Sequence, residues 1–342
     1  MSHLLNDPKA RNWVDAALKR HSISIYGRFE PAVIWTNDKD INGQLIVPVD
    51  PQDLSKRINR DPFIMLHNHD PGNPKGQILE SAVFETLSGI VFVAAVVGFY
   101  AGGNVLKFSD LNFNLEISYP SPKHIPDLPD NAQIELALDP REVDSKWIES
   151  VTANAPIRIK HTEFSYNAAE ITQELISIGI GYLAIVWNPF VTAVASEAGK
   201  RTYQALHDWM KKFLSSMSDR KNPIINIISW QDGCQVSFLL RGKNVKLHYM
   251  AHDALSEGGV QAAELIRKIK KRGNPPTQLT YEWDNEANKW FPSYALLADK
   301  SIIVHKSILI AMERMPTNLS LGISVGTENN KMILPSNVKK KD

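Results

Sequence analysis

The stretch PFIMLHNHDPGNPKGQILESAVFETLSGIVFVAAVVGFY, residues 62–100, decides the fold of the N-terminal part of the chain. It starts with a short apolar run, passes through a turn rich in proline and glycine, and ends in two β-prone runs around a Leu-Ser-Gly turn. Two such runs flanking a short turn predict a β-hairpin. The second run is almost wholly apolar, which indicates a strand that is buried on both faces.

Upstream of this stretch, the runs AVIWT (32–36) and QLIVPV (44–49) are also short and rich in β-branched residues. The polar segment between them is typical of a hairpin turn, so we expect these two runs to pair. Together with the hairpin in 62–100, they predict a mainly antiparallel, barrel-like β-domain over residues 23–118.

The rest of the chain divides by composition. Prolines recur through 119–150 and exclude a long helix there, whereas Tyr203, Leu206 and Met210 follow the spacing of one helix face. The fold class we predict is therefore α+β. Outside the β-domain we expect an N-terminal helix at 1–22, a proline-rich linker at 119–150, a helical segment at 151–222, an α+β domain at 223–330 and a basic tail at 331–342.

The overall composition excludes several classes of partner and site. Thirty-eight basic and 37 acidic side chains give a net charge of +1, so no electrostatic footprint for nucleic acid is present, and we expect no such partner. The single cysteine, Cys234, cannot form an intramolecular disulfide. Because the N-terminus also lacks the apolar core of a signal peptide, we expect a cytoplasmic protein.

Residues 62–100 also resemble the core of the phage prohead maturation proteases, in the apolar strand, the Asn-His-Asp-like motif, the Pro-Gly turn and the apolar second arm of the hairpin. The resemblance implies a small β-barrel whose catalytic histidine corresponds to His69, with Asp70 beside it. In that chemistry a serine attacks the peptide carbonyl while the histidine takes its proton. The family's serine lies on a later strand, where this chain offers no serine in an apolar strand; the candidates are Ser109, Ser118, Ser121 and, in another predicted domain, Ser324.

A metal site is the alternative interpretation of the same motif. His67, His69 and Glu80 resemble in spacing the zinc ligands of the JAMM/MPN metalloproteases, and two histidines with a carboxylate can hold zinc beside an open position for water. The chain departs from that pattern by having Asp70 where the family has proline and Gln77 where it has serine. A third interpretation is structural, with Asp70 opening a tight turn and the histidines as ordinary strand-edge side chains.

Two further features carry weaker predictions. His248 and His252 are four residues apart, which is a metal spacing on a helix; Asp253 adjoins them, and Cys234 lies upstream. The segment 175–196 has 22 residues without a charge, long enough to cross a bilayer, although glycines and a proline interrupt it and favour a buried helical hairpin.

Because the motif lacks a convincing nucleophile, we expect a non-catalytic binding or sensing protein. It would combine a protease-like β-domain with a C-terminal α+β domain that recognises a protein partner, and it would need no cofactor. The alternative is a peptidase, either of the serine type with His69, His67 and Asp70 in its site, or of the zinc type with His67, His69 and Glu80. A further alternative is a membrane-acting effector that uses residues 175–196.

Overall fold

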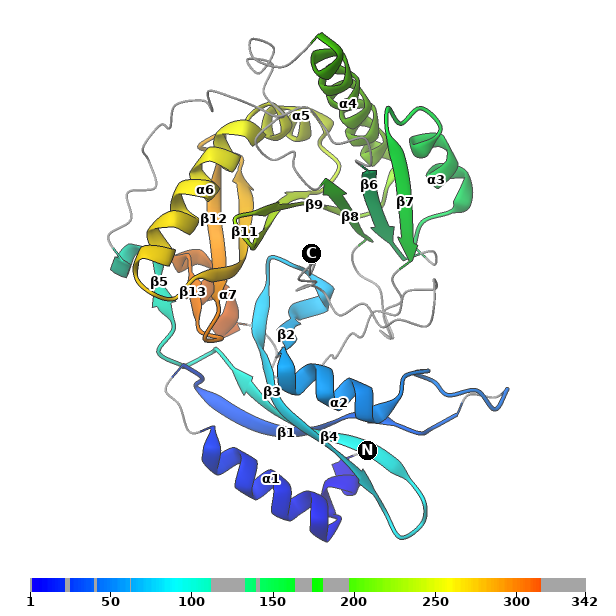
Figure 1. Cartoon of the computed structure of the whole chain (residues 1–342), viewed down its shortest axis with the longest axis vertical. Helices are drawn as coiled ribbons and strands as arrows, with labels where there is room; N and C mark the ends of the chain where they lie inside the picture. The colour runs from blue at the N-terminus through cyan, green and yellow to red at the C-terminus, as the bar shows by residue number, and fades with distance from the viewer. Residues whose placement is uncertain are drawn as a thin grey trace.

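The computed structural model describes residues 2–21, 25–39, 42–61, 63–111, 133–139, 142–163, 174–180 and 197–314. Within these ranges the chain is α+β, as predicted, with one sheet of four strands and one of nine (Figure 1). The small sheet with its helices is called the N-terminal lobe below, and the large sheet with its helices is called the C-terminal lobe.

The N-terminal lobe is built on an antiparallel sheet of order β1-β4-β3-β2. Its strands are β1 (Arg28–Thr36), β2 (Phe63–Leu66), β3 (Pro74–Glu85) and β4 (Val91–Phe99). The hairpin predicted within 62–100 is confirmed as β3–β4. The predicted pairing of 32–36 with 44–49 is wrong, because β1 pairs with β4 and a single bridge, Lys39 to Leu45, joins the intervening loop.

The predicted barrel is also wrong, since this sheet is open. Two helices cover its faces instead: α1 (Pro8–Arg20), which the 3₁₀ turn Ser2–Asn6 precedes, and α2 (Pro51–Arg60). Alternate residues of β4 pack on opposite faces of the sheet. Val93 belongs to the hydrophobic cluster under α2 and Phe92 to the cluster under α1, and both are fully buried. The prediction that this strand is buried on both faces is therefore confirmed, although helices rather than a closed barrel bury it.

The C-terminal lobe contains a mixed sheet of order β5-β13-β12-β11-β10-β9-β8-β6-β7. Its strands are β5 (Leu106–Lys107), β6 (Gln133–Leu138), β7 (Arg158–Glu163), β8 (Glu174–Ile180), β9 (Pro223–Gln231), β10 (Cys234–Arg241), β11 (Pro276–Asp284), β12 (Lys289–Leu297) and β13 (Ile302–Val304). The strands from β9 onward fall within the predicted α+β domain at 223–330. However, β6 falls within the predicted linker and β7 and β8 within the predicted helical segment, so those ranges also supply strands to this sheet.

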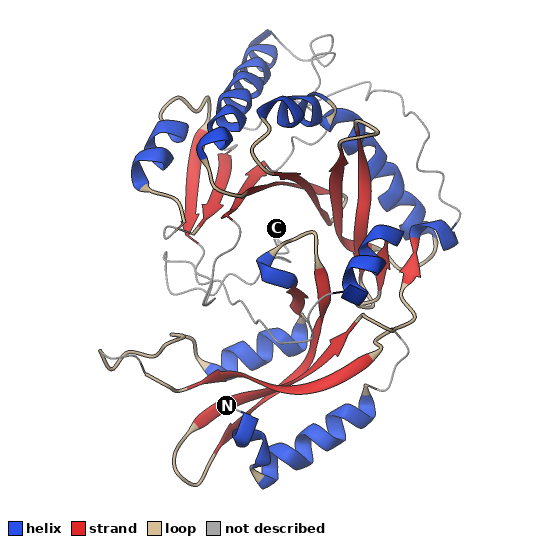
Figure 2. Cartoon of the chain, turned by 180° about the vertical axis from the view of Figure 1, so that it is seen from behind, coloured by secondary structure: helices blue, strands red, loops and turns tan. Residues whose placement is uncertain are grey.

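Helices cover one face of the large sheet, which Figure 2 shows as the outer side of a curved surface. They are α3 (Ser145–Thr152), α4 (Glu197–Ser215), α5 (Val245–Asp253) and α6 (Leu255–Lys271). The predicted face of α4 is confirmed, because Leu206 and Met210 are buried in the main core and Tyr203 packs against it. Along β10, Val236 and Phe238 enter the same core, whereas the alternate residues point to the opposite face of the sheet.

The remaining described elements are short. The helix α7 (Lys306–Arg314) packs on β12, and 3₁₀ turns lie at His67–His69, Phe108–Leu111 and Ser216–Asp219. The helical hairpin predicted within 175–196 is wrong at its start, where residues 174–180 form β8, and residues 181–196 lie outside the described part of the chain. Among the described helices, none combines the length and the apolar character needed to cross a membrane.

Candidate functional site

The motif at 67–73 forms a compact loop at the end of β2. His67 N donates to Asn73 O, Asp70 N donates to His67 O, and Asn73 N donates to Asp70 O, all within 3.0 Å. Asn68 takes a left-handed backbone with φ of 49°, which asparagine tolerates better than most residues. The predicted turn opened by Asp70 is confirmed, because its carboxylate accepts from Gly72 N at 2.9 Å and from Asn73 Nδ2 at 2.7 Å.

The Asp70 carboxylate also connects the N-terminal lobe to the C-terminal lobe through an ion pair. Arg241, the last residue of β10, donates from Nη1 to Asp70 Oδ2 at 2.6 Å and from Nη2 to Asp70 Oδ1 at 2.8 Å. Glu282 of β11 accepts from the other side of the guanidinium at 3.1 Å. Burial by itself lowers the pKa of Arg241, but the hydrogen bonds and charges of these two acids outweigh it and hold that pKa above its ordinary value.

Gly72 lets the loop approach this ion pair closely. A Cβ on Gly72 would lie 2.2 Å from Glu282 Oε1 and 2.4 Å from Arg241 Nη2, so a larger residue would displace the pair. Asp70 itself is only 1% exposed. A buried carboxylate is stable in its charged form when its oxygens are hydrogen-bonded and paired, and Asp70 meets both conditions.

Two neutral hydrogen bonds also connect the lobes. Tyr294 of β12 donates its hydroxyl to Pro71 O at 3.0 Å, and Gln77 Nε2 donates to Lys300 O at 3.1 Å. We call this set of contacts the interlobe joint; it comprises Asp70, Pro71, Gly72 and Gln77 on one side and Arg241, Glu282, Tyr294 and Lys300 on the other. In Figure 1 the tip of the β2–β3 hairpin, where the motif lies, reaches the inner side of the large sheet.

The structure does not bring the predicted zinc ligands of the motif together within the described residues. Glu80 accepts from Arg20 Nη2 at 2.7 Å and lies 3.0 Å from His21 Nε2, both at the end of α1. It is six residues along β3 from Pro74, which pairs with the strand end before His67, so about 20 Å of strand separates the two. The side chain of His69 lies outside the described part of the structure.

The serine-type arrangement is also not assembled among these residues. Burial and the nearby Lys75 ammonium lower the pKa of His67, against the opposing effect of Asp70, and among the described residues its ring makes no hydrogen bond to a hydroxyl. Ser109 donates to the adjacent Asp110 at 3.3 Å. Ser118, Ser121 and Ser324 lie outside the described residues.

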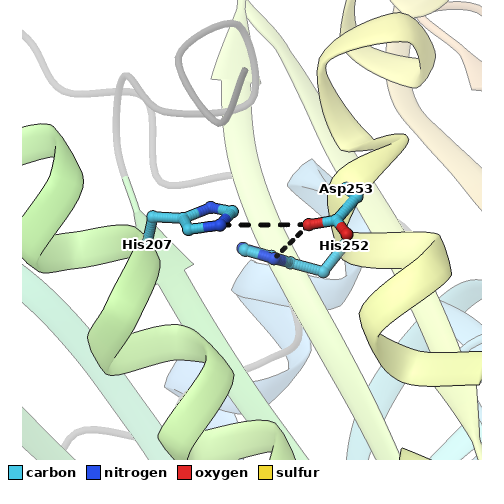
Figure 3. A group of neighbouring side chains, drawn as sticks. All are labelled: His207, His252 and Asp253. Atoms are coloured by element: carbon cyan, nitrogen blue, oxygen red, sulfur yellow. Dashed lines mark ion pairs between the residues drawn. The ribbon is translucent and has the colours of Figure 1, made fainter. Parts of the chain in front are cut away.

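A second group of side chains comes together on the outer helices. The rings of His207 in α4 and His252 in α5 lie with their centroids 4.7 Å apart and their planes tilted by 35°, and the carboxylate of Asp253 points toward both rings (Figure 3). Asp253 Oδ1 lies 3.9 Å from His207 Nε2 and 3.8 Å from His252 Nδ1. Lys211, one turn after His207, places its ammonium 3.1 Å from the same oxygen. We call His207, His252 and Asp253 the histidine cluster.

The electrostatics of the histidine cluster favour neutral rings and a charged carboxylate. Burial lowers the pKa of His207 and of His252, and the nearby Lys211 charge adds to the effect. The contact with His252 and then the Lys211 ammonium lower the pKa of Asp253 to about 2, against a smaller opposing effect of burial. Near pH 7 the cluster therefore presents two neutral imidazoles and one carboxylate.

The spacing of His248 and His252 in the sequence predicted a metal site in this region, but His252 meets His207 and not His248. His248 turns away, with Nε2 3.4 Å from Arg241 O, and Cys234 is fully buried, with its pKa raised to about 12 by burial. His207 was not among the metal ligands predicted from the sequence. A signal was available, because His207 lies next to Leu206 on the predicted helix face, but nothing local showed that α4 packs against α5.

Comparison of the chain with protein-family models, with curated proteins and with solved structures found no match.

Proposed function

We propose that this chain is a non-catalytic binding or sensing protein in which the motif at 67–73 holds two lobes together. The observation that carries the proposal is the state of Asp70. Its two oxygens accept from Arg241, Gly72 N and Asn73, and the residue is 1% exposed. A carboxylate engaged in this way is unavailable to orient a catalytic imidazole, which is the task of the acid in a catalytic triad.

A contact surface for a protein partner lies at the opposite end of the N-terminal lobe. Leu87, at the tip of the β3–β4 hairpin, is fully exposed, and Ile46 is 54% exposed. Both belong to the same end of the sheet, because Asn37 Nδ2 donates to Gly89 O while Ile46 N donates to Asp38 O. A large exposed apolar side chain at a hairpin tip is suited to insertion into a partner's apolar surface. The joint holds this tip at a fixed position relative to the C-terminal lobe.

The test compares variants of the motif with a variant of the tip. His69→Ala and His67→Ala should leave the folded protein intact and change no hydrolytic property, whereas Asp70→Asn should weaken the contact between the lobes. Leu87→Ser should abolish binding of an identified partner without changing the melting temperature. Peptide hydrolysis or self-cleavage by the wild type that His69→Ala removes would overturn the proposal.

The peptidase alternative is tested by the same variants. Its support is His67, whose lowered pKa leaves a neutral ring that can accept a proton. A serine-type enzyme would lose activity in His69→Ala and resist chelators. A zinc-type enzyme would lose activity in His67→Ala, His69→Ala and Glu80→Gln and would be inhibited by chelators. The membrane alternative predicts that the purified chain floats with anionic vesicles and that changes within 181–196 prevent this.

A further inference from the structure

The histidine cluster has the composition of a transition-metal site. Two imidazole nitrogens and one carboxylate oxygen converge from two helices, and one ligand atom of each residue lies within 4.8 Å of the other two. Imidazole and carboxylate together suit zinc and its neighbours among the divalent transition metals, whereas calcium and magnesium prefer oxygen ligands alone. We propose that His207, His252 and Asp253 bind one Zn²⁺ ion that links α4 to α5.

The distances allow this with small movements. Zinc bound at about 2.0–2.2 Å from nitrogen and oxygen in a tetrahedral arrangement holds its ligand atoms about 3.4 Å apart. Asp253 Oδ1 is 3.9 Å from His207 Nε2 and 3.8 Å from His252 Nδ1. The two imidazole nitrogens lie within 4.8 Å of each other, so zinc binding requires a contraction of about 0.5 Å along the two edges to Asp253 and of up to about 1.4 Å between the rings, which side-chain rotation can supply. His252 and Asp253 are consecutive residues in the last turn of α5, so the helix itself holds these two ligands close together.

The Lys211 ammonium contacts the Asp253 carboxylate oxygen that the metal would bind. Its ammonium lies 3.1 Å from Asp253 Oδ1, so it supplies the positive charge that a metal ion would replace. The same ammonium lies 5.8 Å from the centre of the Tyr249 ring. That ring offers a cation–π position to which Lys211 can remain bound when zinc takes the carboxylate. Lys211 is thus a competitor for the site, and its removal should strengthen metal binding.

The site opens to solvent on one side. His252 is fully buried, the side chain of His207 is 17% exposed, and that of Asp253 is 53% exposed. With three protein ligands, a tetrahedral ion keeps a fourth position, which water or a side chain of a partner can fill. This position lies on the outer helices, on the face of the large sheet opposite to the interlobe joint. The metal site is consequently independent of the function proposed for the motif.

The test uses the full-length protein, first freed of metal by dialysis against a chelator. Equilibrium dialysis with Zn²⁺, and Co²⁺ titration followed by visible absorption, measure stoichiometry and coordination. The wild type should bind one equivalent, with a Co²⁺ spectrum of a low-coordinate site. Asp253→Asn and His207→Gln should each weaken binding at least about tenfold, since even the loss of outer-shell partners has that effect. Lys211→Met should bind zinc more tightly than the wild type.

Two controls separate this site from general binding by surface side chains. Asp208→Asn changes a neighbouring exposed carboxylate on α4, and His3→Ala changes an exposed histidine in the other lobe. Both should bind zinc like the wild type. Absence of zinc binding, or equal affinity in the wild type, Asp253→Asn and His207→Gln, would overturn the proposal. Unchanged affinity in Lys211→Met would overturn the competition between the ammonium and the metal. Circular dichroism of each apo variant establishes that it is folded, and Asp253→Asn, at a half-exposed position, is the variant least dependent on core packing.

Discussion

The interlobe joint makes a quantitative prediction for Arg241→Met. This change removes the guanidinium and keeps most of the aliphatic stem, so it leaves the charge of Asp70 buried without its cation. Asp70 is 1% exposed and receives two hydrogen bonds from Arg241, at 2.6 and 2.8 Å. We expect a large loss of stability in which the contact between the lobes fails first.

The magnitude follows from burial and from the type of bond. A hydrogen bond to a charged group contributes about 1.5–3 kcal/mol, and removing one partner of a buried ion pair costs about 3–5 kcal/mol. The Arg241 side chain is 35% exposed, so solvent screens part of the interaction and the lower end applies. We therefore expect a loss of about 3 kcal/mol, which at about 2 °C for each kcal/mol corresponds to about 6 °C in melting temperature.

A double-mutant cycle isolates the interaction. Arg241→Met, Asp70→Asn and the double variant are compared by chemical denaturation and by limited proteolysis between the lobes. Asparagine keeps an oxygen that can accept from Gly72 N, so Asp70→Asn removes the charge and largely preserves the turn. The loss of unfolding free energy in the double variant should be smaller than the sum of the two single losses, by a coupling energy of about 2 kcal/mol.

The matched control is Arg20→Met, which removes an ion pair with Glu80 within the N-terminal lobe. That arginine is 51% exposed, and the loss should stay below about 1 kcal/mol. Equal losses in Arg20→Met and Arg241→Met, or a coupling energy near zero in the cycle, would refute the reasoning that the joint is a buried, charge-assisted contact.

Three further changes have expected outcomes. Lowering the pH from 7.5 to 5.5 should lower the melting temperature, because burial depresses the pKa of His248 and His252 while the unfolded imidazoles take protons near pH 6.5; an increase in stability would contradict this. Cys234, with its pKa raised to about 12, should react with a thiol reagent only after denaturation, and fast labelling of the native protein would contradict its burial. Gly76→Ala should destabilise the N-terminal lobe by at least about 2 kcal/mol, because a Cβ there would lie 2.2 Å from Gly98 O. A denaturation curve of this variant equal to that of the wild type would contradict the predicted clash.

Local signals predicted much of the secondary structure. Asp7 caps the predicted N-terminal helix, with its carboxylate accepting from Lys9 N and Ala10 N, and α6 ends at Lys271, two residues before Gly273. These features depend on residues within a few positions of each other, so the sequence contains their cause. The helix α2 was missed because its short, polar sequence carries little periodic apolar signal, although Asp50 caps it and Pro51 begins it.

The sheets were predicted less well than their strands. The apolar run of β4 showed burial on both faces, but it could not show whether helices or a closed barrel provide the cover. In the structure, α1 and α2 bury opposite faces of the small sheet, which leaves no interior for a barrel. Likewise, β6 and β7 were assigned to other elements because short strands carry weak signals, and their place in the sheet depends on pairing of β6 with β8 and of β7 with β6.

The sequence by itself determined the turn at Asp70 and the β3–β4 hairpin, because each depends on short-range backbone geometry and the period of apolar residues. The tertiary structure alone decided that Asp70 pairs with Arg241, 171 positions away, and that His252 meets His207. Charges and imidazoles at such separations have no local preference for one another. Burial against a particular sheet or helix selects their partners, and the free energy of that packing is a property of the whole fold.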